Sequence, residues 1–598
     1  MRKRLAYLVN AYLLTWLIFS VAKIVFILCC GEGHDVHNSD YADILRHGCS
    51  LDVSTSLYIL IVPFLAAVAS LWVNMPRWLL RTYWIVVSFL LALAFIADTS
   101  LYPFWGFKLD ASCLQYLSQP EGITQSVSIG YLLVRALLLA VVSLFFYFIY
   151  RLCLGDLPEK EPRMKRRVVA SLVALLMTPL MVIGIRGGVD ESTTNIGQVY
   201  YSQNQFLNHA AVNPVFSFLY SLTHQLGDLS EYDFFDAEEC QALTDGVYTT
   251  ESIGSDTLLN TTRPTIVLIL LESAGEEFAS VMPRLQQLKG EGISFTRCYA
   301  NSWRTDRGTV CALSGYPSFP SVSVMKMPEK SRTLPSIASI LRQQGYHTAY
   351  LYGGDINFTN MRSYLIASGW EHLTSMDDYS AADRHTAQWG VRDDITFATL
   401  YDQVTTTAAP ALFGYSTLSS HEPWDVPLQR HDDEVLNAFA YLDDCLADFV
   451  GRLKQSEAWS DLLIVVTADH GINYRHIDQA HPLEKNHIPM LWLGGAIREP
   501  REIDVVCNQS DLAATLLAQL GLPHTDFSFS RDVLSATYTH PCAVHNYNNA
   551  QWMVDSTGHA LYDFTARRFI VSECDDAEQL LKTSKAMLQL TTGDLRQR

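Results

Sequence analysis

Five long apolar runs in the first third of the chain constrain its fold more than any other feature of the sequence. They lie at roughly residues 6–30, 57–75, 79–101, 129–150 and 168–186. Each is close to the ~20 residues that a helix needs to cross the ~30 Å hydrocarbon core of a membrane. No run of this length follows residue 190. We therefore expect a multi-pass α-helical membrane domain with five transmembrane helices at residues 1–188, and a separate domain outside the membrane.

The distribution of positive charge predicts the orientation of these helices. The first run is too long for a cleaved signal peptide and no A-x-A-like site follows it, so we expect a retained helix. Lys and Arg gather at the N-terminus and in the second and fourth connections, whereas the first and third connections carry only Arg46 and Lys108. Cationic loops stay in the cytoplasm. Five crossings of the cell (inner) membrane then leave everything after Arg186 extracytoplasmic, either periplasmic or extracellular.

Charge and cysteine content exclude some classes of partner and site. The chain has a formal net charge of -19, and residues beyond 190 carry 27 Lys and Arg against 50 Asp and Glu. A surface this acidic argues against nucleic acid as a partner. Seven of the 12 cysteines are scattered through this part without a CxxC motif, so neither a disulfide framework nor a zinc-thiolate site is indicated.

The extracytoplasmic part shows the alternation of an α/β domain. Residues 189–262 mix polar and aromatic stretches, which indicates interfacial linker helices, either on the membrane surface or as a plain helical connection. Strands are expected where flat apolar runs occur, at 265–271, 347–352, 411–417 and 462–467. Helical periodicity lies between them, at 282–292, 334–345 and 432–455. We predict a mostly parallel sheet flanked by helices at 263–530, followed by a C-terminal part at 531–598.

Each predicted strand is followed by a residue able to bind a metal or a phosphate. Glu272, Asp355, His421 and the pair Asp469-His470 come directly or shortly after the four strands. Open parallel sheets bind ligands beyond the carboxyl ends of their strands. One acidic residue after a strand is usually a cap or a solvated loop residue, but four such events predict a site. Its oxygen and nitrogen ligands suit Mn²⁺, Mg²⁺ or Zn²⁺.

The stretch NSWRTDRG supplies a nucleophile for such a site. Thr305 lies between Arg304 and Arg307 and has no histidine nearby in sequence to act as its base. Metal coordination makes a hydroxyl a stronger nucleophile. Guanidinium groups suit an anionic tetrahedral ester, because they bind phosphoryl oxygens in pairs. The alternative is a surface loop with two solvated arginines.

These motifs, in this order after membrane helices, resemble the lipoteichoic acid synthase family within the alkaline phosphatase and sulfatase superfamily. The residues that carry the resemblance are LLES, NSWRTDRG, GGDINFTNMR, SSHEP and TADHG. The resemblance implies that Glu272, Thr305, Asp469 and His470 hold one divalent ion, Mn²⁺ or Mg²⁺, with Zn²⁺ as the alternative. It also implies that Thr305 takes glycerol phosphate from phosphatidylglycerol as a phosphothreonine.

The resemblance also assigns residues to substrate binding. It implies that His421 contacts the phosphate and that Asp355 and Arg362 bind the glycerol phosphate head group. Where the family has a tryptophan two residues before that arginine, this chain has Asn360. His487 matches a histidine expected at the rim of the site, although it could equally cap a helix or strand.

The predicted function is transfer of phosphoglycerol from a phospholipid in the outer leaflet to a hydroxyl acceptor, a glycan or a lipid-linked acceptor, in the cell envelope. Sulfate ester hydrolysis is disfavoured, because Thr305 replaces the Cys or Ser of the C/S-x-P-x-R motif that sulfatases convert to formylglycine. Phosphoethanolamine transfer stays open, although VCALSGYP stands where those enzymes have SLPC. A phosphodiesterase and a non-catalytic envelope-binding protein on the same fold stay open as well.

Overall fold

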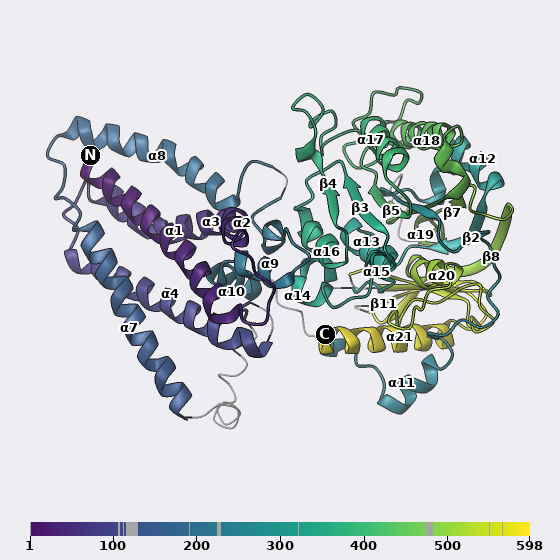
Figure 1. Ribbon diagram of the computed structural model, residues 1–598, viewed down its shortest axis with the longest axis horizontal. Coiled ribbons are helices and arrows are strands. Elements are labelled where there is room, and N and C mark those ends of the chain that lie inside the picture. Colours follow the sequence, from purple (N-terminus) through teal and green to yellow (C-terminus); the bar gives the residue numbers. More distant parts are fainter. Residues whose placement is uncertain are drawn as a thin grey trace. The chain divides into compact units, whose positions relative to one another are not determined.

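The chain forms two compact units, Met1–Gln225 and Leu226–Arg598 (Figure 1). The computed structural model describes every residue except 1, 106–107, 112, 115–128, 191, 224–228, 321, 473, 475–481, 549 and 565. Separate hydrophobic cores occupy the two units, one among the long N-terminal helices and one around the large sheet. Each unit is therefore described by itself.

Five long helices dominate the first unit. They are α1 (Arg2–Cys30), α3 (Cys49–Ala69), α4 (Arg77–Trp105), α7 (Ile129–Leu154) and α8 (Met164–Arg186). Within the described residues, these are the helices that are long and apolar enough to cross a membrane. The five predicted apolar helices are thus present. The shorter α2 (Asp40–His47), α9 (Gln205–Ala211) and α10 (Pro214–Thr223) complete the unit.

The second long helix differs from its predicted range of 57–75, since α3 begins at Cys49 and ends at Ala69. Its first two turns read SLDVSTS, which is too polar to be recognised as part of an apolar run. Asp52, Ser54, Thr55 and Ser56 are nevertheless buried. Asp52 accepts hydrogen bonds from Lys23 and from Asn213. A buried polar group is tolerated when it is paired, so the pairing lets the helix extend beyond its apolar part.

Residues 189–262, the predicted linker, divide between the two units. Helices α9 and α10 belong to the first unit, whereas η2 (Leu229–Tyr232) and α11 (Ala237–Thr244) belong to the second. In η1 (Ile196–Val199) and α9, the side chains of Asn195 and Asn204 cap the helices by accepting backbone N–H bonds. Such caps mark where a helix begins, so η1 and α9 are short helices that are capped separately.

The second unit is built on an eight-stranded sheet in the order β4-β3-β5-β1-β6-β7-β2-β8. Its strands are β1 (Thr265–Leu271), β2 (Ile293–Tyr299), β3 (His347–Tyr352), β4 (His372–Thr374), β5 (Ala411–Ser416), β6 (Leu462–Ala468), β7 (Met490–Leu493) and β8 (Arg501–Asn508). Neighbouring strands pair in parallel except at β7, which is antiparallel to β6 and to β2. The predicted mostly parallel sheet is confirmed, and the four predicted strands are β1, β3, β5 and β6.

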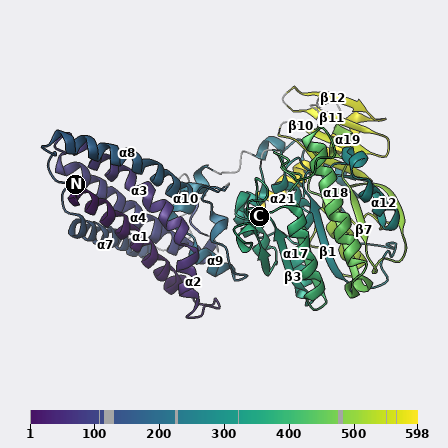
Figure 2. The same cartoon turned by 90° about the horizontal axis from the view of Figure 1, so that it is seen from above.

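Helices cover both faces of this sheet, which explains why its central strands are apolar throughout. Every residue of β1 and of β6 is buried. Helices α12 (Pro283–Glu291), α17 (Asp393–Thr406) and α18 (Glu434–Leu453) lie on one face, and α13 (Thr305–Ser314), α15 (Ile337–Gln343) and α20 (Leu512–Gln519) lie on the other (Figures 1 and 2). Strands buried on both faces read as continuous apolar runs.

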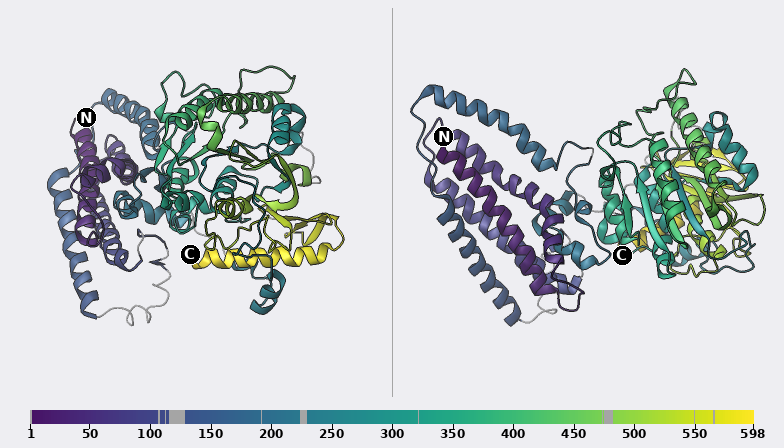
Figure 3. Two further views of the ribbon diagram at one scale, coloured as in Figure 1. Left: turned by 45° about the vertical axis from the view of Figure 1, so that its right-hand side comes forward. Right: turned by 45° about the horizontal axis from the view of Figure 1, so that its top comes forward.

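A second, smaller sheet forms the C-terminal part of this unit. It is antiparallel, in the order β12-β11-β10-β9. The strands are β9 (Cys542–Asn546), β10 (Ala550–Asp555), β11 (His559–Asp563) and β12 (Arg568–Glu573). The last helix, α21 (Ala577–Gln597), contacts β10 and β11 and runs along this sheet (Figure 3). It buries an apolar stripe that includes Leu581 and Leu588.

Candidate active site

Four adjacent strands, β3, β5, β1 and β6, run in parallel and end at the same edge of the sheet. Beyond their carboxyl ends lie Asp355 after β3, His421 after β5, Glu272 after β1, and Asp469 with His470 after β6. The strand order therefore gathers residues that are up to 198 positions apart in the sequence into one region.

Glu272, Asp469 and His470 form a buried cluster that fits a divalent cation. One ligand atom from each lies within 4.8 Å of the others. The Nε2 atom of His470 is 3.6 Å from Glu272 Oε1 and 3.6 Å from Asp469 Oδ2. Two carboxylates and an imidazole are a donor set used by Zn²⁺, Mn²⁺ and Mg²⁺ sites. The residues present therefore fit a metal by their chemistry and their spacing.

The electrostatics of the cluster favour a bound cation. Burial and the neighbouring charge of Glu272 raise the pKa of Asp469 to about 7. Burial alone would raise the pKa of Glu272, but the charges of His470 and His421 outweigh it and the net shift is downward. Burial would lower the pKa of His470, but Asp469 and Glu272 raise it. A divalent ion would stabilise both carboxylates in their ionised form.

Backbone geometry joins the ends of β1 and β6. Ser273 adopts a left-handed conformation, φ 58°. In this conformation its amide donates to Asp469 Oδ1 at 2.9 Å, and its hydroxyl donates to Glu272 Oε1 at 2.7 Å. A positive φ at a residue other than glycine is costly and occurs most often at functional sites. Here it holds the two carboxylates at a fixed separation.

Thr305 is the first residue of α13, and its hydroxyl points to the cluster. The Oγ1 atom donates to Glu272 Oε2 at 3.1 Å and lies 3.4 Å from His470 Nε2. Gly308, one turn along α13, allows this approach, because a Cβ atom there would lie 2.0 Å from the carbonyl oxygen of Asp469. The N-terminus of a helix also favours anions such as phosphate. The predicted nucleophile and metal residues are thus in contact.

The two arginines that flank Thr305 have different environments. Arg307 is buried, and its Nη1 atom donates to the carbonyls of Phe319 and Pro320 at 3.0 and 3.2 Å. The side chain of Arg304 is 47% exposed, and its Nε atom lies 3.8 Å from Asp306. Arg307 therefore holds the backbone of the following loop, while Arg304 is the more exposed of the two cations. Contact of either arginine with a substrate stays a prediction.

His421 is accompanied by an aromatic residue that the sequence did not reveal. The indole of Trp389 lies 4.7 Å from the ring of His421 and donates to the carbonyl of Glu422 at 2.7 Å. Its other neighbour is Phe358, at 5.7 Å. A tryptophan is absent at position 360, where Asn360 takes a positive φ and donates to the carbonyl of Lys326 instead. Nothing local in the sequence around Trp389 indicates this contact.

Asp355 and Arg362 lie together beyond β3. Asn357 connects them, because its amide donates to Asp355 Oδ1 at 3.0 Å and its side-chain oxygen accepts from Arg362 Nε at 2.8 Å. Burial lowers the pKa of Arg362, against the opposing charges of Asp377, Asp355 and Asp378. The predicted head-group pair is therefore preorganised by a shared neighbour.

His487 contacts a different strand. Its Nε2 atom donates to the carbonyl of Thr296 on β2 at 2.8 Å, and its ring lies 5.3 Å from that of Tyr299. Burial lowers the pKa of this imidazole. These contacts are those of a residue that joins β2 to the segment before β7, and the role at the rim of the site stays a prediction.

Comparison with known proteins gives similarities over the second unit. Residues 264–522 match the family model described as Sulfatase. Phosphoglycerol transferase I of Xanthomonas campestris is 25% identical over 281 residues, which are 43% of this chain and 40% of that protein. Lipoteichoic acid synthase 2 of Bacillus subtilis is 24% identical over 44% of this chain and 45% of that protein. The chain thus spans less than half the length of these curated relatives.

A solved structure gives the same result for the fold. A protein of the alkaline phosphatase superfamily from Vibrio parahaemolyticus has a TM-score of 0.54 and 24% identity, covering 62% of this chain and 98% of the other. The name Sulfatase refers to a fold that carries several chemistries. The match therefore identifies the fold of this part and not the reaction. Residues 264–522 thus match the Sulfatase family model, and the chain is similar to phosphoglycerol transferase I and to lipoteichoic acid synthase 2. We call residues 264–522 the sulfatase-type domain.

Proposed function

We propose that this protein transfers the phosphoglycerol head group of a membrane phospholipid, such as phosphatidylglycerol, to a hydroxyl acceptor in the cell envelope. The observation that carries the proposal is the contact of the Thr305 hydroxyl with Glu272 and His470, at 3.1 and 3.4 Å. The names of the relatives, phosphoglycerol transferase and lipoteichoic acid synthase, support this choice among phosphoryl transfers.

In the first step, Thr305 Oγ1 releases its proton to solvent and forms a bond to phosphorus, and the bond from phosphorus to the diacylglycerol oxygen breaks. The departing oxygen needs a proton, and His421 is the titratable group beyond β5 that we assign to supply it. A divalent cation held by Glu272, Asp469 and His470 would, when bound, favour the deprotonated hydroxyl and neutralise phosphoryl charge. The product is diacylglycerol and a phosphothreonine that carries glycerol.

In the second step, the acceptor hydroxyl forms a bond to phosphorus, the bond to Thr305 Oγ1 breaks, and Oγ1 takes up a proton from solvent. His421, now without its proton, takes the proton of the acceptor. In this scheme, Arg304 and the N-terminus of α13 stabilise the negative charge on the phosphoryl oxygens. Asp355 and Arg362 bind the glycerol hydroxyls and phosphate in this scheme, with Trp389 as an apolar wall beside His421.

The helical unit would place the reaction at the membrane surface. We propose that all five apolar helices cross the membrane, with the N-terminus in the cytoplasm and the sulfatase-type domain extracytoplasmic. The donor lipid then lies in the outer leaflet, and anchoring keeps the domain at high effective concentration relative to it. A glycan or a lipid-linked molecule of the envelope serves as acceptor.

The proposal is tested with full-length protein and phosphatidylglycerol labelled in its head group. We expect Thr305→Ala to abolish transfer, and mass spectrometry of the wild type to find glycerol phosphate on Thr305. Thr309→Val is the matched control, because Thr309 lies one turn further along α13 and its buried hydroxyl has no hydrogen-bond partner among the described residues. Transfer by Thr305→Ala would disprove the mechanism. An adduct of another mass would identify a different head group, such as phosphoethanolamine.

A further inference from the structure

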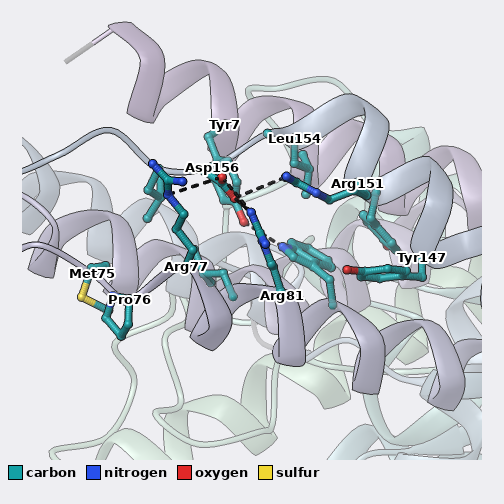
Figure 4. Close-up of a pocket in the computed structure, with 14 residues that line it drawn as sticks. Tyr7, Met75, Pro76, Arg77, Arg81, Tyr147, Arg151, Leu154 and Asp156 are labelled. Atoms are coloured by element: carbon teal, nitrogen blue, oxygen red, sulfur yellow. Dashed lines mark hydrogen bonds and ion pairs between the residues drawn. The ribbon is translucent and has the colours of Figure 1, made fainter.

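A pocket at one end of the helical unit collects three arginines around one aspartate. Arg77 and Arg81 come from the first turns of α4, Arg151 from the last turn of α7, and Asp156 from the loop that follows α7. Figure 4 shows the guanidinium groups converging on the carboxylate of Asp156. We call these four residues, with the aromatic side chains beneath them, the arginine pocket.

The charges of the arginine pocket do not balance. Nitrogen atoms of Arg77, Arg81 and Arg151 lie 3.7, 3.0 and 3.2 Å from the oxygens of Asp156. One carboxylate thus faces three cations, which leaves two positive charges uncompensated within the cluster. The three arginine side chains are 74%, 40% and 41% exposed, and Arg81 Nε has no hydrogen-bond partner among the described residues although that atom is buried.

An aromatic floor lies beneath the arginines. Trp84 stacks on Tyr150 with ring centroids 4.2 Å apart, and its indole N–H donates to the hydroxyl of Tyr7 at 2.7 Å. These three rings are at most 4% exposed. Tyr150 is held in turn by Thr15, with 2.8 Å between the hydroxyls. A pocket with a cationic rim and an apolar floor suits a molecule that is amphipathic in the same way.

The loop that carries Asp156 is fixed by a buried arginine. Arg4 donates to the carbonyls of Pro158 and Glu159 at 3.3 and 2.6 Å. It also donates to the hydroxyl of Ser70, at the end of α3, at 2.7 Å. Arg4 is 6% exposed. These bonds tie the loop to the connection between α3 and α4, so the arginine pocket is preorganised before any ligand binds.

We propose that the arginine pocket binds the phosphate of an anionic phospholipid in the leaflet on the N-terminal side of the helices. Guanidinium groups bind phosphate oxygens in pairs, and an anionic phosphate would compensate the excess charge of the cluster. The pocket lies at the ends of the apolar spans, the level at which lipid head groups meet Arg and aromatic side chains. The acyl chains of such a lipid would lie along the exposed apolar sides of the helices.

This site is distinct from that of the donor lipid. Helix α8 begins at Met164, shortly after Asp156, and has 23 residues, so it spans about 34 Å at 1.5 Å per residue. The chain continues to the sulfatase-type domain from the far end of α8, at Arg186. The arginine pocket therefore lies near the start of α8, whereas the segment that leads on toward the second unit leaves α8 at its other end. The bound lipid serves to anchor or regulate the helical unit.

The test measures lipid binding rather than transfer. Full-length protein in detergent micelles is titrated with phosphatidic acid, which has a phosphate but no transferable head-group alcohol, and with phosphatidylcholine of the same acyl chains. Binding is followed by native mass spectrometry. We expect the double variant Arg81→Gln/Arg151→Gln to weaken binding of phosphatidic acid by about tenfold or more, since each cation near the head groups contributes measurably. Lys165→Gln/Arg166→Gln is the control, because it removes two charges nearby but outside the pocket.

Three results would overturn the proposal. These are unchanged binding by the double variant, an equal loss in the control, or equal binding of phosphatidic acid and phosphatidylcholine. A separate experiment adds inorganic phosphate as a competitor of phosphatidic acid. If millimolar inorganic phosphate displaced the lipid completely, the pocket would be assigned to soluble phosphate instead. If the double variant does not fold, Arg77→Gln gives the same test with the arginine that is most exposed and farthest from Asp156.

Discussion

Arg304 and Arg307 are equivalent in the sequence, one on each side of the Thr305-Asp306 pair, but their surroundings assign them different functions. The Nη1 atom of the buried Arg307 donates to two backbone carbonyls, whereas the side chain of Arg304 is 47% exposed. A buried donor that satisfies two acceptors contributes to stability, and an exposed cation beside a nucleophile contributes to binding of an anion. The two variants should therefore separate stability from activity.

We expect Arg307→Ala to lower the free energy of unfolding by about 2–4 kcal/mol, because it leaves two carbonyls without a donor and creates a cavity. Arg304→Ala should change stability by no more than about 0.5 kcal/mol, while reducing phosphoryl transfer about tenfold or more through loss of a charge-assisted hydrogen bond. Thermal denaturation and transfer assays on both variants check this. Equal destabilisation by the two variants would contradict it.

Asp393 provides a prediction of pH dependence. Its carboxylate accepts hydrogen bonds from the amides of Leu418 and Ser419, in the loop that leads to His421, and from the hydroxyl of Tyr415. Burial nevertheless raises the pKa of Asp393 to about 6, above its ordinary value of 3.8. Because the folded-state pKa is the higher one, this group stabilises the fold fully below pH 3.8 and its contribution is lost as the pH rises through 6.

The loss amounts to about 3 kcal/mol over that interval, at about 1.36 kcal/mol per pKa unit. Denaturation midpoints of the wild type and of Asp393→Asn, measured between about pH 4 and pH 7, test the prediction. We expect the variant to lack this part of the decline, so that the difference in stability between wild type and variant shrinks as the pH rises. Parallel pH profiles for the two proteins would show that Asp393 does not titrate in this range.

Among the secondary-structure elements, the position of α13 against β6 decides whether Thr305 reaches the cluster. Gly308 is the contact point, since a Cβ atom there would meet the carbonyl of Asp469 at 2.0 Å. Backbone cannot yield as a flexible side chain does, so α13 would have to move. The parallel strands fix the carboxylates, and the helix fixes the hydroxyl.

We expect Gly308→Ala to reduce transfer by about 100-fold, the size of effect that a displacement near 1 Å produces, and to destabilise the second unit by about 1–3 kcal/mol through overpacking. Gly290→Ala is the matched control, because Gly290 lies inside α12 with nothing within 4 Å of a Cβ atom. That variant should be stabilised by up to about 1 kcal/mol. Full activity of Gly308→Ala would show that α13 tolerates a shift.

For the molecule as a whole, we expect the cluster to make stability depend on a divalent cation. Glu272 and Asp469 lie close together and buried, so their charges repel each other unless a cation compensates them. We expect Mn²⁺ or Mg²⁺, added after chelation, to raise the free energy of unfolding by about 2.7 kcal/mol at about 100 times the dissociation constant. The effect is measured on the full-length protein as a higher unfolding temperature. Glu272→Gln should lose this effect. Asp444→Asn should keep it, because Asp444 is a half-buried carboxylate of another acidic group, beside Asp448.

Local patterns along the chain were sufficient to predict the two-part organisation, the five apolar helices, the four central strands and the residues at their ends. A span needs only a run of apolar residues, and a strand buried on both faces needs only a flat apolar segment. Helix α3 marks the limit of that reasoning. Its polar first turns can be buried because Asp52 forms hydrogen bonds with Lys23 and Asn213. A local sequence pattern does not show pairing between residues that are far apart in the chain.

Which of the candidate side chains meet depended on the packing of distant segments. The fold brings Thr305 to Glu272 and His470, buries Arg307 while leaving Arg304 exposed, and places Trp389 beside His421. Burial and contact arise between segments far apart in the chain, whereas residue type and spacing are properties of neighbours in sequence. The arginine pocket is the same case. Its three arginines predicted only an orientation, and they form a site because the first turns of α1 and α4 and the last turn of α7 lie together.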